Sequence, residues 1–368
     1  MVNYDLKKIF DNFQVEGTFI DAQTYGSGHI NDTFTVTCAG SRQNHRYILQ
    51  RINHNIFKKP DELMDNVVRV TRHIRSKLQA RGLDDIDRRV LTVIPTVDEK
   101  AYYVNGDGNY WRLYIFIEGA KTYDVMENLD QACQAAKSFG EFQKMLVDLP
   151  GAKLYDTIPD FHNGQKRYAA FEQALKADVC GRAKDAAAEI EFLKEHSWIF
   201  DVFPDLVSSG QIPVRITHND TKINNVMINN ETNEGICVID LDTVMPGLAL
   251  YDFGDIMRTT LSPTEEDETD LSKVGMRMER FEAILRGYLT AAADFLNKAE
   301  VEHLVFSGKM ITLMIGTRFL TDHLAGDTYF KIHRQNHNLD RCRTQFKLVQ
   351  SITENEEEMK KLVEEVLS

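Results

Sequence analysis

Residues 217–225 read THNDTKINN, and residues 235–240 read GICVID. Residues 212–217 form an apolar stretch that leads into the first segment, and the second segment is an apolar run that ends on Asp240, so each predicts a strand followed by polar side chains. Phosphoryl transfer needs a carboxylate that accepts the proton of the acceptor hydroxyl and oxygen ligands that hold Mg²⁺. Polar loop residues can also simply cap and turn, but two framing strands favour the chemical interpretation. We therefore predict Asp220 as the catalytic base and Asn225 and Asp240 as ligands of Mg²⁺.

Other polar residues near these segments have less direct roles. We expect His218 to hold the loop by hydrogen bonds rather than to act as a base. Asp252 begins a DFG triplet, but no apolar strand precedes it. We therefore expect it to brace the loop from the start of a helix, as an N-terminal cap does. Asp242, two residues beyond Asp240, either assists the metal, binds substrate or is a hydrogen-bonded acid.

The part of the chain before residue 119 predicts an antiparallel sheet with one helix. Residues 32–38 and 46–52 alternate and are rich in β-branched and aromatic side chains. Residues 101–104 and 111–117 flank a turn that contains two glycines, as in a hairpin. A helix should begin at Pro60, because proline suits a first helical position and apolar residues follow at helical spacing.

Helical periodicity dominates after residue 125. The segments that show it are 129–149, 168–176, 184–196, 276–296, 300–324 and 341–368. The change of pattern predicts a bilobal α+β protein with a cleft between its lobes. We expect residues 1–119 to form an N-terminal nucleotide-binding lobe and residues 120–368 to form a C-terminal lobe for catalysis and substrate binding.

A glycine-containing segment lies in the predicted N-terminal lobe. Residues 25–34 read YGSGHINDTF. Gly26 and Gly28 would let the backbone approach a phosphate closely, with amide hydrogens pointing at it. A hairpin turn explains two such glycines at least as often. The phosphate interpretation gains weight because a loop that covers a nucleotide belongs in the β-rich lobe, ahead of the catalytic segment.

Composition excludes several classes of protein. The 368 residues carry 43 Lys and Arg against 56 Asp and Glu, a net charge of −13, which repels the phosphate backbone of nucleic acids. Of the residues, 43% are hydrophobic, yet no apolar run is long enough to span a bilayer. The start shows no signal peptide, and five dispersed cysteines without a CxxC pair fit reduced thiols. We expect a cytoplasmic protein with no nucleic-acid, membrane or obligate protein partner.

These residues together resemble the aminoglycoside phosphotransferase-like kinases, which are small-molecule relatives of protein kinases and share the Asp-x(4)-Asn spacing of the catalytic loop. Within that group the sequence is most similar to the N-acetylhexosamine 1-kinases. The resemblance runs from about residue 15 to 350. It is carried by residues 25–31, 47–50, 217–225, 239–247, 318–322 and 338–345. The catalytic loop alone indicates the superfamily, whereas the THNDTK form and the C-terminal stretches are more specific.

The resemblance implies a protein-kinase-like fold that binds ATP and Mg²⁺ in the interlobe cleft. The γ-phosphoryl group would pass to the anomeric hydroxyl of N-acetylglucosamine or N-acetylgalactosamine, giving a 1-phosphate for amino-sugar salvage. The residues that match nucleotide-binding positions are Gly26, Gly28, Asn31, Gln50, Phe116 and Glu118, the last two through backbone groups. The residues that match sugar-binding positions are His29, Arg318 and Tyr329, together with Asp220. Independently, Arg318 stands in an apolar helical segment, where a charge needs a partner, and Asp322 or Asp327 could supply a structural one.

One departure from the wider kinase pattern leaves alternatives open. Gln50 stands where a phosphate-pairing lysine is usual, and the following helix offers no obvious counterpart glutamate. Mg²⁺, the loop amides, Lys222 or Arg51 could neutralise the α- and β-phosphates, although Arg51 should point to the opposite face from Gln50. The competing functions are a kinase of the same fold for choline, homoserine or an aminoglycoside, and a catalytically silent nucleotide-binding protein.

Overall fold

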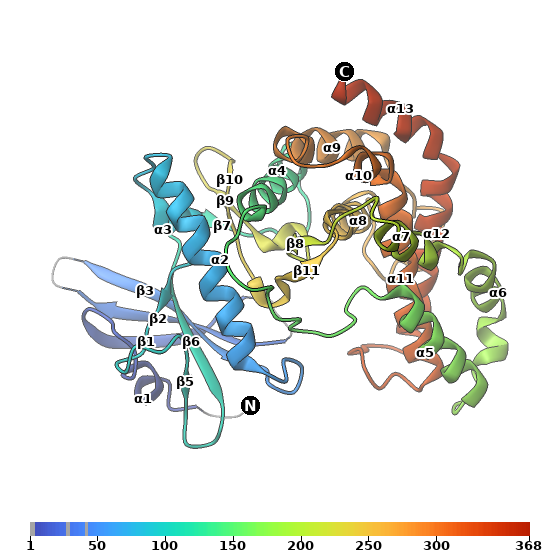
Figure 1. The fold of residues 1–368 in the computed structure, drawn as a ribbon. Helices are drawn as coiled ribbons and strands as arrows, with labels where there is room; N and C mark the ends of the chain where they lie inside the picture. The colour runs from blue at the N-terminus through green and yellow to red at the C-terminus, as the bar shows by residue number, and fades with distance from the viewer. Residues whose placement is uncertain (1–3, 27–29, 41–42) are drawn as a thin grey trace.

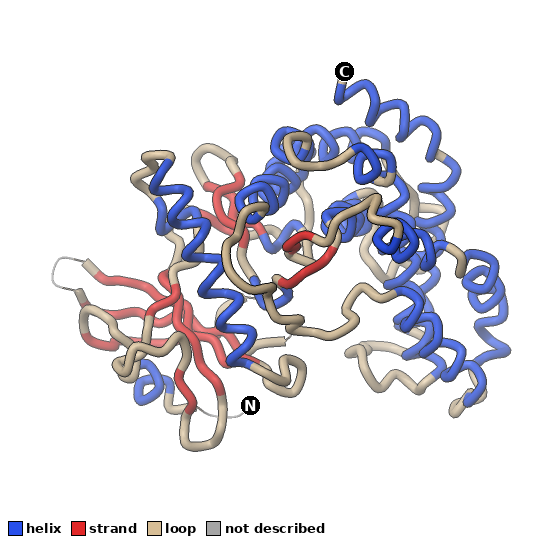
Figure 2. Tube along the Cα trace, viewed as in Figure 1, coloured by secondary structure: helices blue, strands red, loops and turns tan. Residues whose placement is uncertain are grey.

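The N-terminal lobe is built on an antiparallel sheet of six strands with the order β1-β2-β3-β6-β4, in which β5 also pairs with β6. The computed structural model describes residues 4–26, 30–40 and 43–368. The strands of this sheet are β1 (Thr18–Thr24), β2 (Asp32–Ala39), β3 (Asn44–Ile52), β4 (Val93–Ile94), β5 (Tyr103–Val104) and β6 (Tyr110–Ile115). Figure 2 shows that these strands gather at one end of the molecule and that helices dominate the other. The predicted strands and hairpin are present, and β1, which the sequence did not single out, adds an edge.

A long helix, α2 (Pro60–Ala80), lies across the sheet beside the second lobe (Figure 1). Pro60 occupies its first turn as predicted, and Gly82 follows its end with a φ of +73°, a conformation that glycine adopts without strain. The buried face of α2 packs against the sheet and also against α4 (Leu129–Leu146) of the other lobe. This shared core holds the two lobes together. Two short helices, α1 (Leu6–Phe10) and α3 (Ile86–Arg89), complete this end of the described chain.

The C-terminal lobe consists mainly of helices packed around a buried centre. They are α4, α5 (Gly164–Ala177), α6 (Ala187–His196), α7 (Ile199–Ser208), α8 (Ala249–Thr260), α9 (Met278–Ala292), α10 (Lys298–Glu302), α11 (Leu304–Leu324), α12 (His337–Glu354) and α13 (Glu356–Leu367). The helices α4 and α9 lie in direct contact at Gly287, where a Cβ atom would come within 2.1 Å of the Cys133 carbonyl oxygen. Only glycine permits this approach.

The central helix α11 is long and apolar enough to cross a membrane, but 83% of its apolar window is buried inside the protein. A core helix of a globular protein has this pattern. Its last turns lead to the loop that joins it to α12 and that carries Tyr329.

Short strands in the C-terminal lobe carry the segments that the sequence singled out. They are β7 (Ala120–Lys121), β8 (Arg215–Thr217), β9 (Val226–Asn229), β10 (Gly235–Val238) and β11 (Met245–Gly247). The sequence did not reveal β9 and β11. It also placed strand ends incorrectly: β8 begins at Arg215 rather than at residue 212, because Pro213 has no backbone N–H for a ladder. Strand β10 ends at Val238, and Asp240 follows it with a φ of +58°.

The protein therefore has an α+β, protein-kinase-like fold with an antiparallel N-terminal lobe and a helical C-terminal lobe, as predicted. The division between residues 119 and 120 remains a prediction. Strand β7 begins just beyond it and pairs with β9 of the second lobe.

Candidate active site

Two pairs of short strands place the predicted catalytic residues side by side. Strand β8 pairs with β11 and ends at Thr217, so the loop that carries Asp220 begins directly at its end. The loop closes in a short 3-10 turn, and β9 then pairs with β10. The backbone N–H of Ile239 donates to the carbonyl oxygen of Asn225 at 2.9 Å, which puts Asn225 next to Asp240. The structure thus brings together the three residues that the sequence predicted to act together.

Asp220 is held by two neighbours on its own loop. Its carboxylate lies 3.0 Å from the Lys222 ammonium and accepts a hydrogen bond of 3.1 Å from the Asn225 side chain. Burial alone would raise the pKa of Asp220, but the Lys222 charge and hydrogen bond outweigh it and hold that pKa below its usual value. The group is therefore ionised near neutral pH, which is the state in which a base accepts a proton.

The side chains beside Asp220 offer oxygen atoms to a cation. The Asn225 amide nitrogen donates to the carbonyl and carboxylate oxygens of Asp220, so its own oxygen is left for another partner. Asp240 is exposed at its edge, but protein atoms surround its carboxylate closely. This burial, together with the Asp242 and Asp220 carboxylates, raises the pKa of Asp240 to about 7. Crowded carboxylates of this kind favour a bound cation.

The donor set fits Mg²⁺ rather than a metal held by protein alone. Within the described ranges, no three His, Cys, Asp or Glu side chains gather closely enough to hold an ion. Mg²⁺ usually binds one or two protein oxygens and completes its shell with water and substrate phosphates. Asp240 and Asn225 would hold the ion, whose positive charge would offset the negative charge of the phosphates. These metal-binding roles remain predictions.

Asp252 and His218 fix the loop from behind. The Asp252 carboxylate accepts from the backbone N–H groups of His218 at 2.9 Å and Asn219 at 2.7 Å and from the Gln143 side chain at 2.6 Å. Asp252 lies in the first turn of α8, but the N-cap of that helix is Leu248. Asp252 therefore braces the loop, as expected, by accepting from the backbone amides of the loop and not by capping its own helix. The His218 ring also holds the loop, as predicted. Its Nε2 atom contacts the Ile239 carbonyl oxygen at 2.9 Å, and its Nδ1 atom accepts from the backbone N–H of Asp220 at 3.3 Å.

Asp242 is neither solvated nor open to a metal. It is 2% exposed, and one carboxylate oxygen contacts Arg112 of β6 in a buried ion pair. The other oxygen accepts from the Asn31 amide at 2.7 Å. Of the alternatives left open, the structure selects a hydrogen-bonded acid, and it joins the two lobes. The Asn31 side chain, predicted to bind nucleotide, is therefore engaged with protein, since its oxygen also accepts from the backbone of Asn53.

Gln50 lies on β3 directly opposite Arg112 on β6. Its side-chain oxygen accepts two hydrogen bonds from the Arg112 guanidinium, at 3.0 and 2.9 Å. Arg112 was not predicted from the sequence, although a charged residue in the middle of the apolar stretch YWRLYI indicates a buried charge that needs a partner. Arg51 pairs with Asp32 at 2.6 Å, which supports the expectation that it points away from Gln50.

The glycine-containing turn is described only in part. Gly26 has a φ of +79°, and a Cβ atom there would meet no neighbour within 4 Å, so the space around it is open. Gly28 and His29 lie outside the described residues. The Tyr25 ring, next to Gly26, contacts the Phe116 ring at 5.7 Å between centroids. The turn therefore lies close to the connection between the lobes.

That connection has two backbone groups that could bind a base. The Phe116 N–H donates to Arg46, and the Glu118 carbonyl accepts from Arg88. Within the described part of the chain, the Phe116 carbonyl and the Glu118 N–H have no hydrogen-bond partner. An acceptor and a donor two residues apart can pair with the edge of a nucleotide base. The Glu118 side chain itself is occupied by an exposed ion pair with Arg46.

Arg318 of α11 has no carboxylate partner among the described residues. Its guanidinium lies above the rings of Tyr329 and Phe330, and it reaches the Tyr329 hydroxyl at 3.5 Å, the limit of a hydrogen bond. Burial and the positive charge of Arg167 lower its pKa. The structure thus brings together Arg318 and Tyr329, two of the residues predicted to bind substrate.

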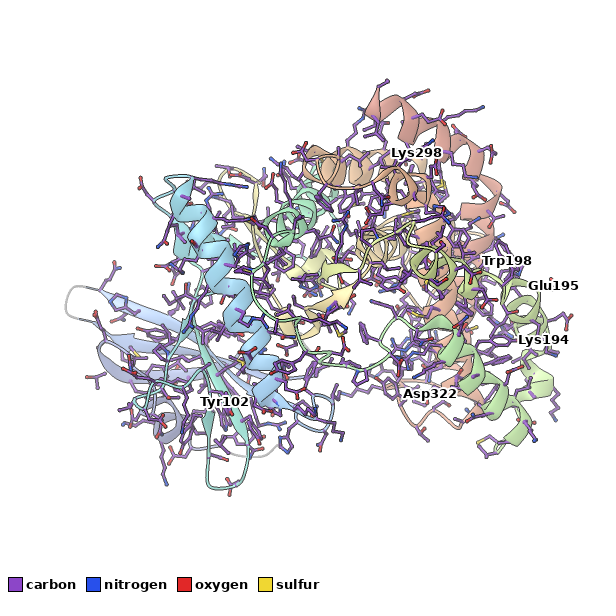
Figure 3. All side chains as sticks on the ribbon, viewed as in Figure 1. Tyr102, Lys194, Glu195, Trp198, Lys298 and Asp322 are labelled. Atoms are coloured by element: carbon purple, nitrogen blue, oxygen red, sulfur yellow. The ribbon has the colours of Figure 1, made fainter. Side chains whose placement is uncertain are left out.

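The two acids that could have paired with Arg318 have other partners. Asp322 accepts from the backbone N–H groups of residues 328–330 and from Asn338, so it shapes the loop that carries Tyr329 (Figure 3). Asp327 pairs with Arg182 at 2.5 Å. Neither acid therefore serves as a structural ion-pair partner for the buried charge of Arg318.

Arg318 belongs to a positively charged region on one side of Asp220. Arg258 of α8 interacts electrostatically with both Asp220 and Arg318. Arg167 donates through one terminal nitrogen to the carbonyl of Phe161, but its buried Nε atom has no partner. The region therefore has guanidinium N–H groups without protein acceptors.

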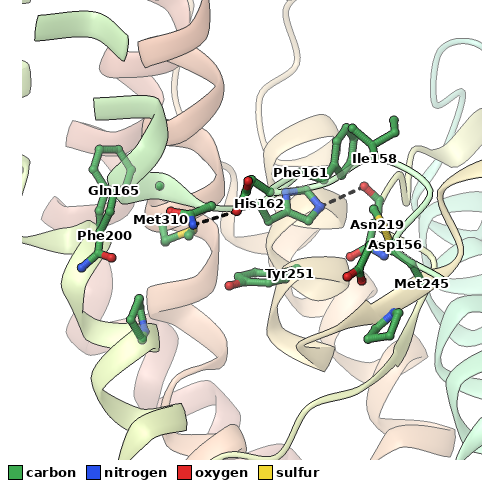
Figure 4. A pocket seen from close by; sticks show the side chains of 15 residues that line it. Asp156, Ile158, Phe161, His162, Gln165, Phe200, Asn219, Met245, Tyr251 and Met310 are labelled. Atoms are coloured by element: carbon green, nitrogen blue, oxygen red, sulfur yellow. Dashed lines mark hydrogen bonds between the residues drawn. The ribbon is translucent and has the colours of Figure 1, made fainter. Parts of the chain in front are cut away.

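A cavity of about 320 Å³ lies beside the loop that carries Asp220, and the close view in Figure 4 shows its lining. His162 projects into this region and contacts the carbonyl oxygen of Asn219, the residue before Asp220, at 3.0 Å. Its ring packs against the rings of Phe161 and Tyr251. Asn219 lines the cavity, but Asp220 does not. His162 thus supports the loop from the side of this cavity.

Comparison with known proteins gives one family and several related folds. Residues 21–294 match the model of a family described as the phosphotransferase enzyme family. An aminoglycoside phosphotransferase from Alicyclobacillus acidocaldarius superposes with a TM-score of 0.65 and 13% identity, covering 99% of this chain and 98% of that one. A choline kinase from Cryptosporidium parvum gives 0.56 and 14%, covering 95% and 93%. A spectinomycin phosphotransferase solved with ADP and spectinomycin gives 0.50 and 15%, covering 96% and 97%.

Proposed function

The chain belongs to the phosphotransferase enzyme family, and we propose that it transfers the γ-phosphoryl group of ATP to the anomeric hydroxyl of an N-acetylhexosamine. Asp220 would accept the proton of that hydroxyl, and its lowered pKa keeps it ionised for the task. Mg²⁺ would be held by Asn225 and Asp240 and would supply charge stabilisation at the phosphates. The product would be a sugar 1-phosphate, which suits a role in amino-sugar salvage.

Several features support ATP as the donor. The free Phe116 carbonyl and Glu118 N–H have the donor and acceptor spacing that an adenine edge needs. The open turn at Gly26 lies next to Phe116 through Tyr25. A related fold has been solved with ADP. The nucleotide would therefore lie between the glycine-containing turn and the connection of the lobes.

The observation that carries the acceptor proposal is the guanidinium of Arg318, which has no carboxylate partner among the described residues and, like Asp220, lies close enough to His162 to shift its pKa. An N-acetylhexosamine is uncharged and offers an acetamido carbonyl and several hydroxyl oxygens as hydrogen-bond acceptors. Arg318 keeps guanidinium N–H groups beyond its single long contact with Tyr329, and the buried Nε of Arg167 has no acceptor. Tyr329, which is 68% exposed, would present a ring and a hydroxyl to the same sugar. His29 would contribute from the N-terminal lobe.

The same observation disfavours the alternative acceptors. Choline, ethanolamine and aminoglycosides are cations, and a site for them needs carboxylates or an aromatic cage. A cationic acceptor placed beside Arg318 and Arg167 would meet like charges in a partly desolvated site, where repulsion is strong, whereas Arg258 is already neutralised by Asp255 and Glu266. The presence of Asp220, Asn225 and Asp240 in one constellation also disfavours a catalytically silent protein.

The decisive experiment is an ADP-release assay with Mg-ATP and a panel of acceptors. The panel holds N-acetylglucosamine, N-acetylgalactosamine, glucose, galactose, choline, homoserine and kanamycin, and phosphorus NMR assigns the product. We expect a 1-phosphate from the N-acetylated sugars alone. Asp220→Asn should lower turnover by about 10²- to 10⁴-fold and leave Mg-ADP affinity nearly unchanged, because the amide keeps the shape but takes no proton.

A matched control is Asp294→Asn, which removes an exposed carboxylate paired with Lys144 of α4. It should keep full activity. Turnover of choline or kanamycin in place of the sugars would refute the acceptor proposal, and full activity of Asp220→Asn would refute the assignment of the base.

We propose a cytoplasmic location from the free thiols of all five cysteines, three of which are buried. The structure describes no disulfide bond among them. The absence of an obligate protein partner remains a prediction.

A further inference from the structure

Arg112 is a fully buried cation at the point where the two lobes meet. Its side chain is 1% exposed and lies in the middle of β6. One terminal nitrogen contacts Asp242, a residue 130 positions later in the C-terminal lobe. The Nε and the other terminal nitrogen both donate to the Gln50 oxygen. Burying such a charge is costly unless geometry is excellent, and apolar residues often stabilise a core as well, so stability alone does not explain Arg112.

The contact with Arg112 fixes which way the Gln50 amide faces. A guanidinium has only donors, so the atom turned toward it must be the amide oxygen. The Gln50 nitrogen is then directed to the other side, where one N–H donates to the Thr33 hydroxyl at 2.9 Å. Its second N–H has no acceptor among the residues that the structure describes. Without Arg112, the amide could turn and present its oxygen instead.

Asp242 fixes Arg112 in turn. One of its oxygens holds the guanidinium, and the other is held by Asn31. The Asp242 backbone carbonyl also accepts from the Thr157 hydroxyl at 2.8 Å. The chain of contacts therefore runs from Asp242 in the C-terminal lobe through Arg112 to the amide of Gln50. Asp242 fixes the orientation of Arg112, and Arg112 fixes the orientation of Gln50.

The helix beside the sheet does not supply this support. In protein kinases a glutamate of the corresponding helix positions the lysine on the strand. Here α2 places the Met64 sulfur 3.9 Å from Arg112. Its carboxylates at Glu62 and Asp65 pair with Lys59 and Arg69 at the surface.

We propose that Arg112 is a positioning residue that orients the amide of Gln50 so that its free N–H donates to a nucleotide phosphate oxygen. The inference rests on the proposed binding of ATP. It assigns to Arg112 and Asp242 the part that the helix glutamate plays when the strand carries lysine. Arg112 itself does not touch the nucleotide.

A double-mutant cycle on Mg-ADP affinity, measured by titration calorimetry, tests this assignment. Gln50→Ala should weaken binding about tenfold, since one hydrogen bond to a charged acceptor is lost. The charge-neutral pair Arg112→Met/Asp242→Asn should weaken it to a similar extent. The triple variant should be no weaker than either, because both changes remove the same N–H contact. Lys309→Met/Glu356→Gln removes another largely buried ion pair, between α11 and α13, and should bind as the wild type does.

Arg112→Lys is the second variant, and it retains the charge if the neutral pair fails to fold. A lysine cannot hold both Gln50 and Asp242 with a planar fork, so affinity should still fall about tenfold. Wild-type affinity in Arg112→Lys or in the neutral pair would overturn the proposal. Losses that multiply to about a hundredfold in the triple variant would also overturn it.

This test separates the inference from the acceptor proposal. Mg-ADP binding needs no acceptor, so the cycle can succeed even where no hexosamine is phosphorylated. A wild-type protein that does not bind Mg-ADP would refute both.

Discussion

Replacing His162 with glutamine should remove one step from the pH dependence of stability. The His162 ring is 9% exposed, and its Nδ1 atom is buried without a partner. Its Nε2 atom contacts the Asn219 carbonyl oxygen and therefore donates, which needs only the neutral ring. Burial lowers the pKa of His162 to about 4. A glutamine side chain can donate to the same carbonyl, but it does not titrate.

The size and sign of this change in the unfolding free energy follow from the difference in bound protons between the folded and unfolded states. An unfolded histidine has a pKa of about 6.5. Between that pH and about 4, the unfolded chain binds a proton at this position and the folded protein does not. Stability therefore falls as the pH falls through this window, by about 1.4 kcal/mol per pH unit and by about 3 kcal/mol in total. Above pH 6.5 and below pH 4 the residue contributes no slope.

Urea unfolding at half-unit steps from pH 7.5 to 4 measures the effect as the difference between wild type and His162→Gln. The difference in unfolding free energy should shift in favour of the variant by about 3 kcal/mol as the pH falls. His303→Gln is the control, because His303 also contacts a helix carbonyl but is only partly buried. Parallel curves for wild type and His162→Gln across this range would refute the assignment of a buried neutral ring.

Three further predictions concern the site itself. Asp240→Asn should raise the Mg²⁺ concentration for half-maximal activity at least tenfold, because a carboxylate ligand is lost, and an unchanged requirement would contradict its role. Asp252→Ala should destabilise the protein by roughly 3–5 kcal/mol in urea unfolding, because three buried donors lose their acceptor, and a loss below about 1 kcal/mol would contradict the bracing role. Arg318→Met should raise the KM for N-acetylglucosamine about tenfold and leave the KM for ATP unchanged, whereas the reverse pattern would place Arg318 at the nucleotide.

The local pattern of the sequence was enough to predict most of the framework and to single out the segment that carries Asp220. Alternation identifies β2 and β3, and a helical repeat after Pro60 identifies α2, because both are properties of neighbouring residues. Strand β9 is only four residues long and directly follows the catalytic loop, so its pattern could not be told from the loop. Its pairing with β10 is what places Asn225 beside Asp240.

A pattern of neighbouring residues could not predict contacts between residues that are far apart in the sequence. Arg112 and Asp242 are 130 positions apart, and nothing local indicates that they meet. The sequence showed that lysine was absent at position 50, but not that Gln50 has a buried guanidinium behind it. For Arg318 it offered Asp322 and Asp327 as partners from proximity alone, and the structure gives both acids to other groups.

The local sign of charge around Asp220, rather than the net charge of the chain, decides which acceptors fit. The surface is acidic, with a net charge of −13, and a polycation would gain from it at long range. Salt screens exposed charges beyond about 8 Å, however, so the acceptor experiences the groups that line its own site. On the side of Asp240 those groups are carboxylates, whose negative charge favours a cation. On the side of Arg318 they include the guanidiniums of Arg318 and Arg167, which have no carboxylate partner among the described residues, whereas Arg258 is already paired with Asp255 and Glu266. An uncharged acceptor rich in oxygen can accept hydrogen bonds on the second side without competing with a cation for the first, whereas an ammonium group would be repelled on the second.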